Sequence, residues 1–411
     1  MNANIQIVNK TIKGTLNLSG SKSISNRLLI LQALSKQSTK LKNLSDSDDT
    51  SVLQKALSSS DTFIDVGIAG TAMRFLTAYY ALRGSEVVLT GASRMKQRPI
   101  KGLVDALCSL GADIEYMEEE GFPPLKIKGK SLQGGVLRMK SDISSQFISA
   151  LLMVGPYFEK GLQLELQGAV ISRPYIEMTL NLMKKQGVSH QWEGHTISIL
   201  PGSYQTNISQ VESDWSSISY LFELVALSDA GSIELTQVDE DSVQGDQEVM
   251  RYFKFLGVDS SIKQGVLTLR KMSDVELPKH LEFDCLNTPD LAQTLAATAC
   301  GLGVSMKLIG LQSLPIKETD RLMALKNELE KCGAQVLILN NEALEVIPGA
   351  SLLNQNFYFQ TYGDHRMAMC LAPLALKAQS VTLNNPMVVN KSYKSYWEDL
   401  KTLSFQIQLI N

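Results

Sequence analysis

Four segments of the chain share a pattern in which an apolar helical run ends at a glycine and an extended segment follows. The glycines are Gly111, Gly187, Gly257 and Gly333, and they are spaced by 76, 70 and 76 residues. Glycine just beyond an amphipathic run is the usual left-handed end of a helix. A nearly constant period of this length predicts repeated structural units, about six in a chain of 411 residues, with less regular helix ends in the outer two.

The residues around these glycines predict an alternation of strands and helices within each unit. In one unit, strands are predicted at 87–90 and 113–116, on either side of a helix over 99–110. A helix over 146–154 and an alternating apolar–polar strand over 162–166 follow. Each unit is therefore predicted to contain a strand, a helix, a strand, a helix and a pair of strands. Six units predict two lobes of three, but periodicity leaves open whether helices or sheets lie inside.

The charge and composition exclude several classes of protein. Lys and Arg total 39 and Asp and Glu total 42, so the net charge of −3 does not suit a protein that coats nucleic acid or an anionic membrane. No stretch approaches the roughly 20 apolar residues of a membrane span, and the first ten residues lack the core of a signal peptide. Five scattered cysteines and four histidines argue against a disulfide framework or a metal site. We expect a cytoplasmic enzyme.

The first candidate anion site is the helix start within Gly20–Leu29. Backbone N–H groups at a helix start favour a phosphate, and Lys22, Ser23 and Arg27 add two cations and a hydroxyl. A nucleotide-binding P-loop is excluded, because the spacing of the glycines and the lysine does not fit G-x-x-x-x-G-K-[ST]. The alternative is a capped helix with solvated charges.

Four more segments of the N-terminal half combine helix starts with polar or cationic side chains. At 67–74, glycines permit close approach of the backbone to a ligand, and Thr71 is the predicted N-cap. The segment 94–99 is a cationic cluster that ends at a proline able to open the next helix. The segments 144–147 and 172–175 are polar helix starts, for which simple capping is the alternative.

In the C-terminal half, titratable residues gather at helix starts. Asp290 precedes an apolar helix and suits either a cap or a general base. The segment 317–321 packs four charges into five residues, a pattern typical of a solvated face. The titratable triplet 364–366 instead leads directly into an apolar helix over 367–376, where charges need partners or a ligand. Lys391 alone has the pattern of a surface lysine.

Together these segments resemble the 5-enolpyruvylshikimate-3-phosphate (EPSP) synthases over essentially the whole chain. The matching segments, in order, are Gly20–Arg27, Gly70–Arg74, Arg94–Pro99, Ser144–Phe147, Ser172–Tyr175, Pro289–Asp290, Lys317–Arg321, Asp364–Met369 and Lys391. The Lys-Glu-Thr-Asp-Arg and Asp-His-Arg-Met-Ala-Met segments are highly specific in combination, whereas neither would suffice alone.

The resemblance implies a two-lobed α/β fold in which each lobe is an inside-out barrel of three βαβαββ units, in agreement with the period of the glycines. It also implies that the chain crosses between the lobes twice, near 19–21 and 213–214. The first lobe would then combine residues 1–19 and 214–411, and the second would span 20–213. The turn-forming stretch 201–206 independently places the main boundary in this part of the chain.

The resemblance further implies a reaction. Members of the family transfer the enolpyruvyl group of phosphoenolpyruvate to the 5-hydroxyl of shikimate 3-phosphate and release phosphate through a tetrahedral intermediate. Two phosphates and two carboxylates must share one site, which requires several cations and fixed donors. No metal or organic cofactor is implied. The expected protein is a cytoplasmic monomer with small-molecule substrates and no nucleic-acid or membrane partner.

The resemblance assigns roles residue by residue. Asp290 is expected to accept the proton of the 5-hydroxyl, Glu318 to protonate C3 of phosphoenolpyruvate, and Lys22 to bridge both substrates. The shikimate 3-phosphate site is expected to comprise Lys22, Ser23, Arg27, Ser144, Ser145, Gln146, Ser172, Asp290, Ser313 and Lys317. The phosphoenolpyruvate site is expected to comprise Lys22, Gly70, Arg98, Gln146, Arg321, Arg366 and Lys391.

Two positions depart from the family's pattern. Ile68 and Ser313 stand where many members have an asparagine, so weaker phosphoenolpyruvate binding and a partly replaced shikimate contact are expected. One alternative function is enolpyruvyl transfer to UDP-N-acetylglucosamine. That enzyme usually has a reactive cysteine in a Gly-rich loop, whereas Cys108, close to the Arg98 region, falls on a predicted apolar helix face. The other alternative is a non-catalytic anion-binding relative, which would not need both Asp290 and Glu318.

Overall fold

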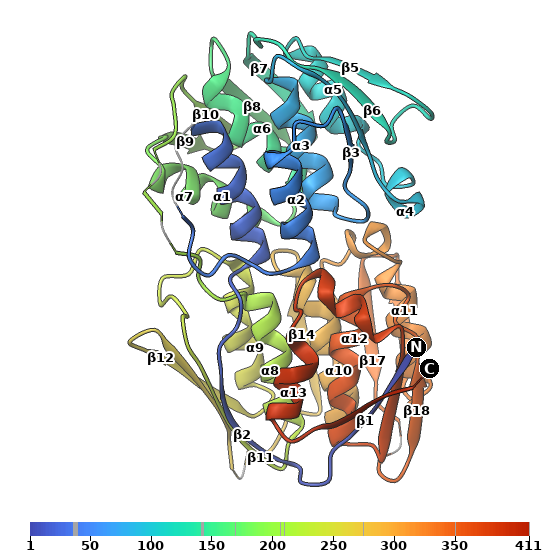
Figure 1. Ribbon diagram of the computed structural model, residues 1–411. Coiled ribbons are helices and arrows are strands. Elements are labelled where there is room, and N and C mark those ends of the chain that lie inside the picture. Colours follow the sequence, from blue (N-terminus) through green and yellow to red (C-terminus); the bar gives the residue numbers. More distant parts are fainter. Residues whose placement is uncertain are drawn as a thin grey trace. The chain divides into compact units, whose positions relative to one another are not determined.

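The computed structural model describes residues 1–35, 40–140, 144–168, 170–205, 207–208, 210–273, 275–349 and 351–410. The chain divides into two compact units (Figure 1). Unit 1 comprises Met1–Ser19 and Glu212–Asn411, and unit 2 comprises Gly20–Val211. The second crossing lies two residues before the 213–214 boundary implied by the resemblance.

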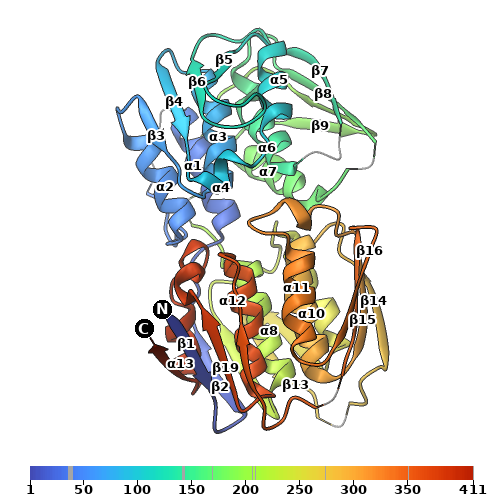
Figure 2. The same cartoon turned by 90° about the vertical axis from the view of Figure 1, so that its right-hand side faces the viewer.

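Unit 1 is built from three four-stranded sheets, each completed by helices (Figure 2). The first contains β2 (Thr11–Leu16), α8 (Trp215–Leu227), β11 (Ala230–Leu235), α9 (Val249–Lys254), β12 (Val258–Lys263) and β13 (Val266–Lys271). The second contains β14 (His280–Asp284), α10 (Ala292–Leu302), β15 (Ser305–Ile309), α11 (Arg321–Glu330), β16 (Gln335–Leu339) and β17 (Ala343–Ile347). The third contains β18 (Asn356–Phe359), α12 (His365–Leu371), β19 (Ser380–Asn384), α13 (Tyr396–Thr402), β20 (Gln406–Ile410) and β1 (Asn2–Gln6).

The three sheets share one strand order: β12-β13-β11-β2, β14-β15-β17-β16 and β18-β19-β1-β20. In each, a parallel pair is extended by two antiparallel pairings, which is the order that a βαβαββ unit produces. The N-terminal strands complete two of these sheets. Ala3 of β1 pairs with Leu383 and Leu409, and Ile12 of β2 pairs with Gly231. These pairings explain why the first residues of the chain belong to unit 1.

Unit 2 repeats the plan twice in its described part. One repeat contains β3 (Phe63–Asp65), α3 (Gly70–Ala81), β4 (Glu86–Thr90), α4 (Ser93–Lys96), α5 (Lys101–Ser109), β5 (Asp113–Tyr116) and β6 (Leu125–Lys128). The other contains β7 (Gly135–Lys140), α6 (Ser145–Val154), β8 (Leu162–Gln167), α7 (Arg173–Lys185), β9 (His190–Glu193) and β10 (Thr196–Ile199). Helices α1 (Lys22–Ser35) and α2 (Asp48–Ser58) accompany a single parallel bridge between Lys42 and Gln210.

Backbone geometry confirms the repeat predicted from the glycines. All four lie between a helix and the next strand with positive φ: +105° at Gly111, +88° at Gly187, +80° at Gly257 and +78° at Gly333. The expectation of a less regular outer repeat is also met in unit 1, where Ser404 lies between α13 and β20 with φ +72°. Glycine adopts this region without steric cost, whereas serine does not.

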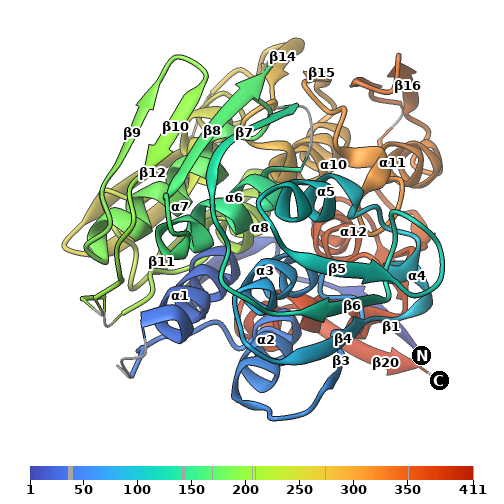
Figure 3. The ribbon, with the colours of Figure 1, turned by 90° about the horizontal axis from the view of Figure 1, so that it is seen from above.

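Burial settles which layer is inside. In unit 1, α8 and α12 are buried almost all round, and α10 is buried along Ala292–Cys300. In unit 2 the same holds for α3. Strands such as β8 instead alternate between buried and less buried residues. The most buried helices therefore form the interior of each unit, and Figure 3 shows α3 and α6 of unit 2 between the two sheets of that unit.

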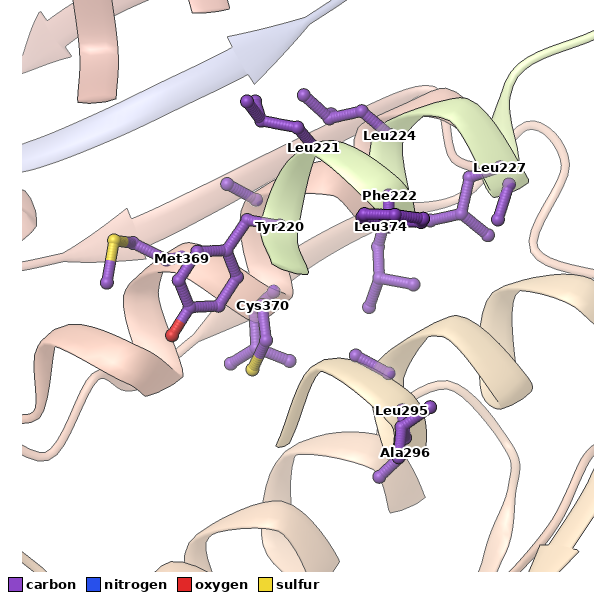
Figure 4. Packing of buried hydrophobic residues seen from close by; sticks show 14 of the residues in the cluster. Tyr220, Leu221, Phe222, Leu224, Leu227, Leu295, Ala296, Met369, Cys370 and Leu374 are labelled. Atoms are coloured by element: carbon purple, nitrogen blue, oxygen red, sulfur yellow. The ribbon is translucent and has the colours of Figure 1, made fainter. Parts of the chain in front are cut away.

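The core of unit 1 lies where α8, α10 and α12 pack on one another. Figure 4 shows side chains of α8, including Tyr220 and Phe222, close to Cys370 of α12 and to Leu295 of α10. Near the C-terminal ends of α8 and α10, a Cβ added at Gly301 would lie 2.6 Å from Leu227, so the two helices meet too closely for a larger residue. This close packing holds the N-terminal ends of three helices together, where the charged motifs lie.

Two local predictions were wrong. Thr71 does not cap α3: the helix begins at Gly70 after Ala69, without a side-chain cap, and Thr71 Oγ1 accepts a hydrogen bond from Gln146. Cys108 does not lie on the apolar face of α5 but is exposed, because Leu103, Val104, Ala106 and Leu107 form the buried face.

Candidate active site

The charged residues of unit 1 gather around Arg321, the first residue of α11. Asp320 caps this helix, accepting hydrogen bonds from the backbone N–H groups of Leu322 and Met323, both at 3.1 Å. This cap fixes the first turn of α11 and therefore the backbone position of Arg321. The side chain is 2% exposed, so its charge depends on protein partners rather than on water.

Three carboxylates surround the Arg321 guanidinium. Nε donates to Asp364 Oδ2 at 2.7 Å, Nη1 to Asp290 Oδ1 at 3.1 Å, and Nη2 to Glu318 Oε2 at 3.0 Å. Asp364 comes from the start of α12 and Asp290 from the short 3₁₀ helix Pro289–Leu291 before α10. One arginine thus ties together residues from three segments that are far apart in the sequence.

Three further cations contact the same carboxylates. Arg366 Nη2 donates to Asp290 Oδ2 at 2.7 Å, and its Nη1 donates to the Tyr220 hydroxyl at 3.3 Å. Lys391 Nζ donates to Glu318 Oε1 at 2.5 Å, and Lys317 Nζ lies 3.8 Å from Asp290 Oδ1. The structure therefore brings together all the acidic and basic residues that the resemblance assigns to this half of the chain.

This surrounding charge keeps Asp290 ionised. Burial raises the pKa of its carboxyl, but Arg366, Lys317 and Arg321 lower it by more, so the pKa lies far below its usual range. Burial also lowers the pKa of Lys317, which Asp290 and Glu318 only partly offset. The cluster accordingly contains an ionised acceptor beside a lysine whose proton is held less firmly than usual.

In unit 2 the candidate residues start from helix α1. Lys22 Nζ lies 3.7 Å from Asp49 Oδ2, and Ser23 is partly buried beside it. Arg27 is buried one turn later, where it donates to Thr179 Oγ1 at 2.7 Å and to Ser149 Oγ at 3.2 Å. Burial lowers the pKa of Arg27 to about 10, so it is still charged at neutral pH.

Gly70 and Arg98 fit each other closely. A Cβ added at Gly70 would lie 2.6 Å from Nη1 of Arg98, so a larger residue there would push this guanidinium away from the start of α3. Gln146, in the first turn of α6, donates from Nε2 to Thr71 Oγ1 at 3.2 Å. The start of α3, the Arg98 side chain and the start of α6 are thereby linked.

The predicted serines lie at helix starts. Ser144 caps α6 by accepting from the N–H of Gln146 at 3.3 Å, and Ser145 is the first residue of that helix. Ser172 precedes α7 in the left-handed region, with φ +55°, and its hydroxyl makes no capping bond. Ser144 therefore fits the capping alternative, whereas Ser172 does not.

The two departures from the family pattern have different surroundings. Ile68 is 45% exposed in the loop before α3. Ser313 precedes the 3₁₀ helix Leu314–Ile316, and its buried Oγ has no hydrogen-bond partner in the described part of the chain.

Sequence reasoning missed several residues that support the cluster. Tyr220 and Ser216 of α8 both contact Arg366, and Asp246 contacts Ser216. The repeat contained a usable signal, because Asp214, Asp290 and Asp364 are spaced by 76 and 74 residues and each begins one of the three inner helices of unit 1. That spacing indicates α8 as the third helix that borders the cluster.

The described residues contain neither a candidate membrane span nor a candidate metal cluster. Within the ranges that the structure covers, no helix is long and apolar enough to cross a membrane. The same residues contain no group of three or more His, Cys, Asp or Glu side chains that could hold a metal ion.

The βαβαββ repeats and the buried cluster of acids and cations define an α/β protein with an acid–base site, and comparisons with known proteins show its family. The family model described as EPSP synthase (3-phosphoshikimate 1-carboxyvinyltransferase) matches residues 8–60 and 51–400. The chain belongs to this family.

Relatives agree with that assignment, and a solved structure shares the fold. The chain is similar to the 3-phosphoshikimate 1-carboxyvinyltransferase of Bacteroides fragilis strain YCH46, at 46% identity over 400 residues and 97% of both chains. It is similar to the enzyme of that name from Aliivibrio fischeri strain ES114, at 37% identity over 423 residues, 96% of this chain and 97% of the other. The fold matches EPSP synthase from Acinetobacter baumannii, with a TM-score of 0.78, 19% identity and full coverage of both chains.

Proposed function

We propose that this chain transfers the enolpyruvyl group of phosphoenolpyruvate to the 5-hydroxyl of shikimate 3-phosphate and releases phosphate. The step belongs to the shikimate pathway and leads to the aromatic amino acids. The observation that carries the proposal is the charge cluster of unit 1, in which Asp290 and Glu318 are held by one buried arginine. Addition and elimination need a proton acceptor for the hydroxyl and a proton donor for C3, and a pair of carboxyls can supply both.

Asp290 acts as the proton acceptor in this proposal. It is ionised without substrate because Arg366, Lys317 and Arg321 lower its pKa. When Arg366 and Arg321 bind the anionic groups of phosphoenolpyruvate, their attraction for Asp290 weakens and its basicity rises. The acid thus becomes a competent base only once the second substrate is bound.

Glu318 and the remaining cations complete the chemistry. Glu318 accepts hydrogen bonds from Lys391 and Arg321. When these cations turn to the anionic groups of phosphoenolpyruvate, the Glu318 carboxylate would take up a proton from solvent and transfer it to C3. Lys317 would lie beside the intermediate as charge develops on it, and Lys391 would join the arginines on phosphoenolpyruvate. Asp364 has a positioning role, because it holds Arg321 at 2.7 Å and caps α12.

The residues of unit 2 would recognise the same two substrates. Ser23, Arg27, Ser144, Ser145, Gln146 and Ser172 are assigned to shikimate 3-phosphate, with Asp290, Ser313 and Lys317 from unit 1. Gly70, Arg98 and Gln146 are assigned to phosphoenolpyruvate. Lys22 would bridge both substrates. The α3 start and the Arg98 guanidinium together offer N–H donors that suit a phosphate.

The expected partners are these two small molecules alone. A near-neutral chain with concentrated local cations fits small anions rather than a polyanion. We propose a cytoplasmic monomer that requires neither a metal nor an organic cofactor, because the cations of the cluster supply the electrostatic stabilisation.

The test is phosphate release after shikimate 3-phosphate and phosphoenolpyruvate are mixed with the protein. The wild type should release stoichiometric phosphate. Asp290→Ala should be slower by about 1,000-fold, on the order of what a proton-transfer group contributes. Lys22→Met, which loses the cation that bridges both substrates, should also be nearly inactive. Asp241→Asn, an exposed acid of unit 1, serves as the control and should match the wild type.

Three outcomes contradict the proposal. Both substrates bound without phosphate release would identify a non-catalytic anion-binding relative. Release with UDP-N-acetylglucosamine in place of shikimate 3-phosphate would identify the other enolpyruvyl transferase. Full activity of Asp290→Ala would refute the role given to that carboxyl.

A further inference from the structure

A fourth carboxyl of unit 1, Asp246, reaches the charge cluster through a hydroxyl. Arg366 Nη2, which donates to Asp290 Oδ2 at 2.7 Å, also donates to Ser216 Oγ at 3.3 Å. The Ser216 hydroxyl in turn donates to Asp246 Oδ2. Arg366 therefore serves two acids, Asp290 directly and Asp246 through Ser216.

Asp246 is held firmly in this position. It lies in the 3₁₀ helix Gly245–Glu248 and is 4% exposed. Gln244, two residues before Asp246, links this segment to the start of α8. Its Oε1 accepts a hydrogen bond from the N–H of Trp215 at 3.1 Å, and its Nε2 donates to the carbonyl of Ser213 at 2.9 Å. These two hydrogen bonds of Gln244 keep Asp246 beside Ser216.

The surroundings of the other oxygen of Asp246 indicate that this carboxyl is neutral for part of the time. Oδ1 is buried and has no hydrogen-bond partner in the described part of the chain. Such an oxygen is costly to bury as half of an ionised carboxylate, and less costly when the carboxyl carries a proton.

The charged and titratable groups around Asp246 oppose one another. Burial raises its pKa most, and the repulsion of Asp290 and Asp214 raises it further, while Arg366 and the Ser216 hydroxyl lower it; the balance places the pKa at about 7. The thiol of Cys285 also faces Asp246, whose charge helps to raise the pKa of that thiol. Two carboxyls beside one arginine thus differ in protonation at neutral pH: Asp290 is ionised and Asp246 is poised between both forms.

We infer that Asp246 is a positioning residue that sets, through Ser216, how strongly Arg366 binds phosphoenolpyruvate. This inference rests on the proposed function. A neutral Asp246 keeps Ser216 in place without competing for the positive charge of Arg366. An ionised Asp246 adds a negative charge behind Arg366 and weakens its hold on an anionic substrate.

The direction of the pH effect follows. Below pH 6 Asp246 is protonated and phosphoenolpyruvate binds at its tightest. As the pH rises through 7, Asp246 ionises and the KM for phosphoenolpyruvate rises. Binding of the substrate anion favours the protonated form, and we expect the KM to rise about tenfold between fully protonated and fully ionised Asp246.

The experiment measures the KM for phosphoenolpyruvate and kcat from pH 5.5 to 9 at saturating shikimate 3-phosphate, for the wild type and Asp246→Asn. Asparagine has the shape of a carboxyl that cannot ionise. The ratio of the wild-type KM to the variant KM cancels the titration of phosphoenolpyruvate itself. We expect this ratio to be constant below pH 6 and to rise about tenfold by pH 8.5.

Three further variants complete the design. Asp246→Ala removes the acceptor of Ser216 together with the charge, so its KM should exceed that of Asp246→Asn at every pH. Asp241→Asn, the control, should give a constant ratio. Ser216→Ala removes a hydrogen bond that lowers the pKa of Asp246, so the rise in KM should move to higher pH. This variant tests the inference even if Asp246→Asn does not fold.

The outcomes separate this inference from the proposed function. Three results would overturn the role of Asp246 alone. The first is a KM ratio for Asp246→Asn that does not change with pH, and the second is a change in kcat only. The third is a KM rise that stays at the same pH, or moves to lower pH, in Ser216→Ala. If the wild type releases no phosphate from the two substrates at any pH, the proposed function fails first.

Discussion

The two units hold their buried arginines in opposite ways. In unit 1, Arg321 donates to three carboxylates, and its positive charge is more than balanced by their negative charge. In unit 2, Arg27 donates to hydroxyls of Thr179 and Ser149 and to the backbone carbonyls of Ser23 and Tyr175. Arg27 therefore keeps an unbalanced positive charge, whereas Arg321 belongs to an ion-pair network.

This difference shows how one fold supports two tasks. A cation that is positioned by neutral oxygens attracts an anionic ligand at full strength, which suits recognition. A cation that is shared among carboxylates sets the pKa values of those carboxylates, which suits proton transfer. The repeats of the two units are alike in topology, so the division of labour comes from the side chains at the helix starts.

The comparison is tested most strongly by Arg321→Gln. The substitution leaves Asp364, which is fully buried, without its main cation, and it weakens the hold on Asp290 and Glu318. We expect the free energy of unfolding to fall by about 3–5 kcal/mol, as when one partner of a buried ion pair is removed. Urea unfolding curves measure the change.

The control is Arg251→Gln, which removes an exposed pair with Glu248. It should cost less than about 1 kcal/mol. If the two variants are equally stable, Arg321 is not the centre of a stabilising network and the contrast between the units is lost.

Arg27→Gln should affect substrate binding more than stability, the reverse of Arg321→Gln. Its partners are neutral and keep other hydrogen bonds, as Thr179 does with Ser149, so the loss of stability should be about 1–2 kcal/mol. The loss of an unbalanced charge should raise the KM for shikimate 3-phosphate on the order of 100-fold. Steady-state kinetics beside urea unfolding give both numbers. A large loss of stability with a normal KM would make Arg27 a structural residue.

Much of this arrangement could be predicted from the sequence because it is local. The glycine period located the helix ends, and a strand was placed at 113–116, where β5 lies. The resemblance named Arg321 and Arg366, which the structure brings to the same carboxylate. The periodicity did not reveal the inside-out layering, because a helix buried all round and a helix on a surface can share one apolar stripe.

The network behind these residues could not be predicted. Asp246 follows a glycine in a polar stretch that is typical of a surface turn, and only the packing of its segment against α8 buries it. Tyr220 has the pattern of a core residue, and its contact with Arg366 spans 146 positions of the sequence. Contacts over such separations depend on how the repeats close on one another.

Glu223 of unit 1 is a buried carboxyl that differs from the carboxylates around Arg321. Unlike Asp290, this buried carboxyl of α8 has no hydrogen-bond partner in the described part of the chain, and burial raises its pKa well above 4.5. In the unfolded chain Glu223 ionises above about pH 4.5, while in the folded protein it stays neutral, so it lowers stability increasingly as the pH rises above that value. Glu223→Leu should therefore raise the free energy of unfolding by about 1–3 kcal/mol at pH 7.5 and by less at pH 5.

Urea unfolding at the two pH values measures this effect, with the exposed Glu276→Gln as the control. A Glu223→Leu protein that is less stable than the wild type at pH 7.5 would show that the carboxyl has a stabilising partner. An equal gain at both pH values would assign the effect to packing rather than to ionisation.

The smallest effect is expected at Ile68 of unit 2, the unit whose cation is suited to ligand recognition. Ile68 is exposed in the loop before α3 and offers a ligand only its backbone, where many family members have an asparagine. Ile68→Asn adds an amide that can donate to phosphoenolpyruvate, and a net hydrogen bond of about 1 kcal/mol corresponds to a KM lowered roughly fivefold. Because the side chain is outside the core, stability should not change. Ile68→Val, which has no amide, is the matched control. A KM for phosphoenolpyruvate that is the same in the wild type and Ile68→Asn would mean that a neighbouring group already makes this contact.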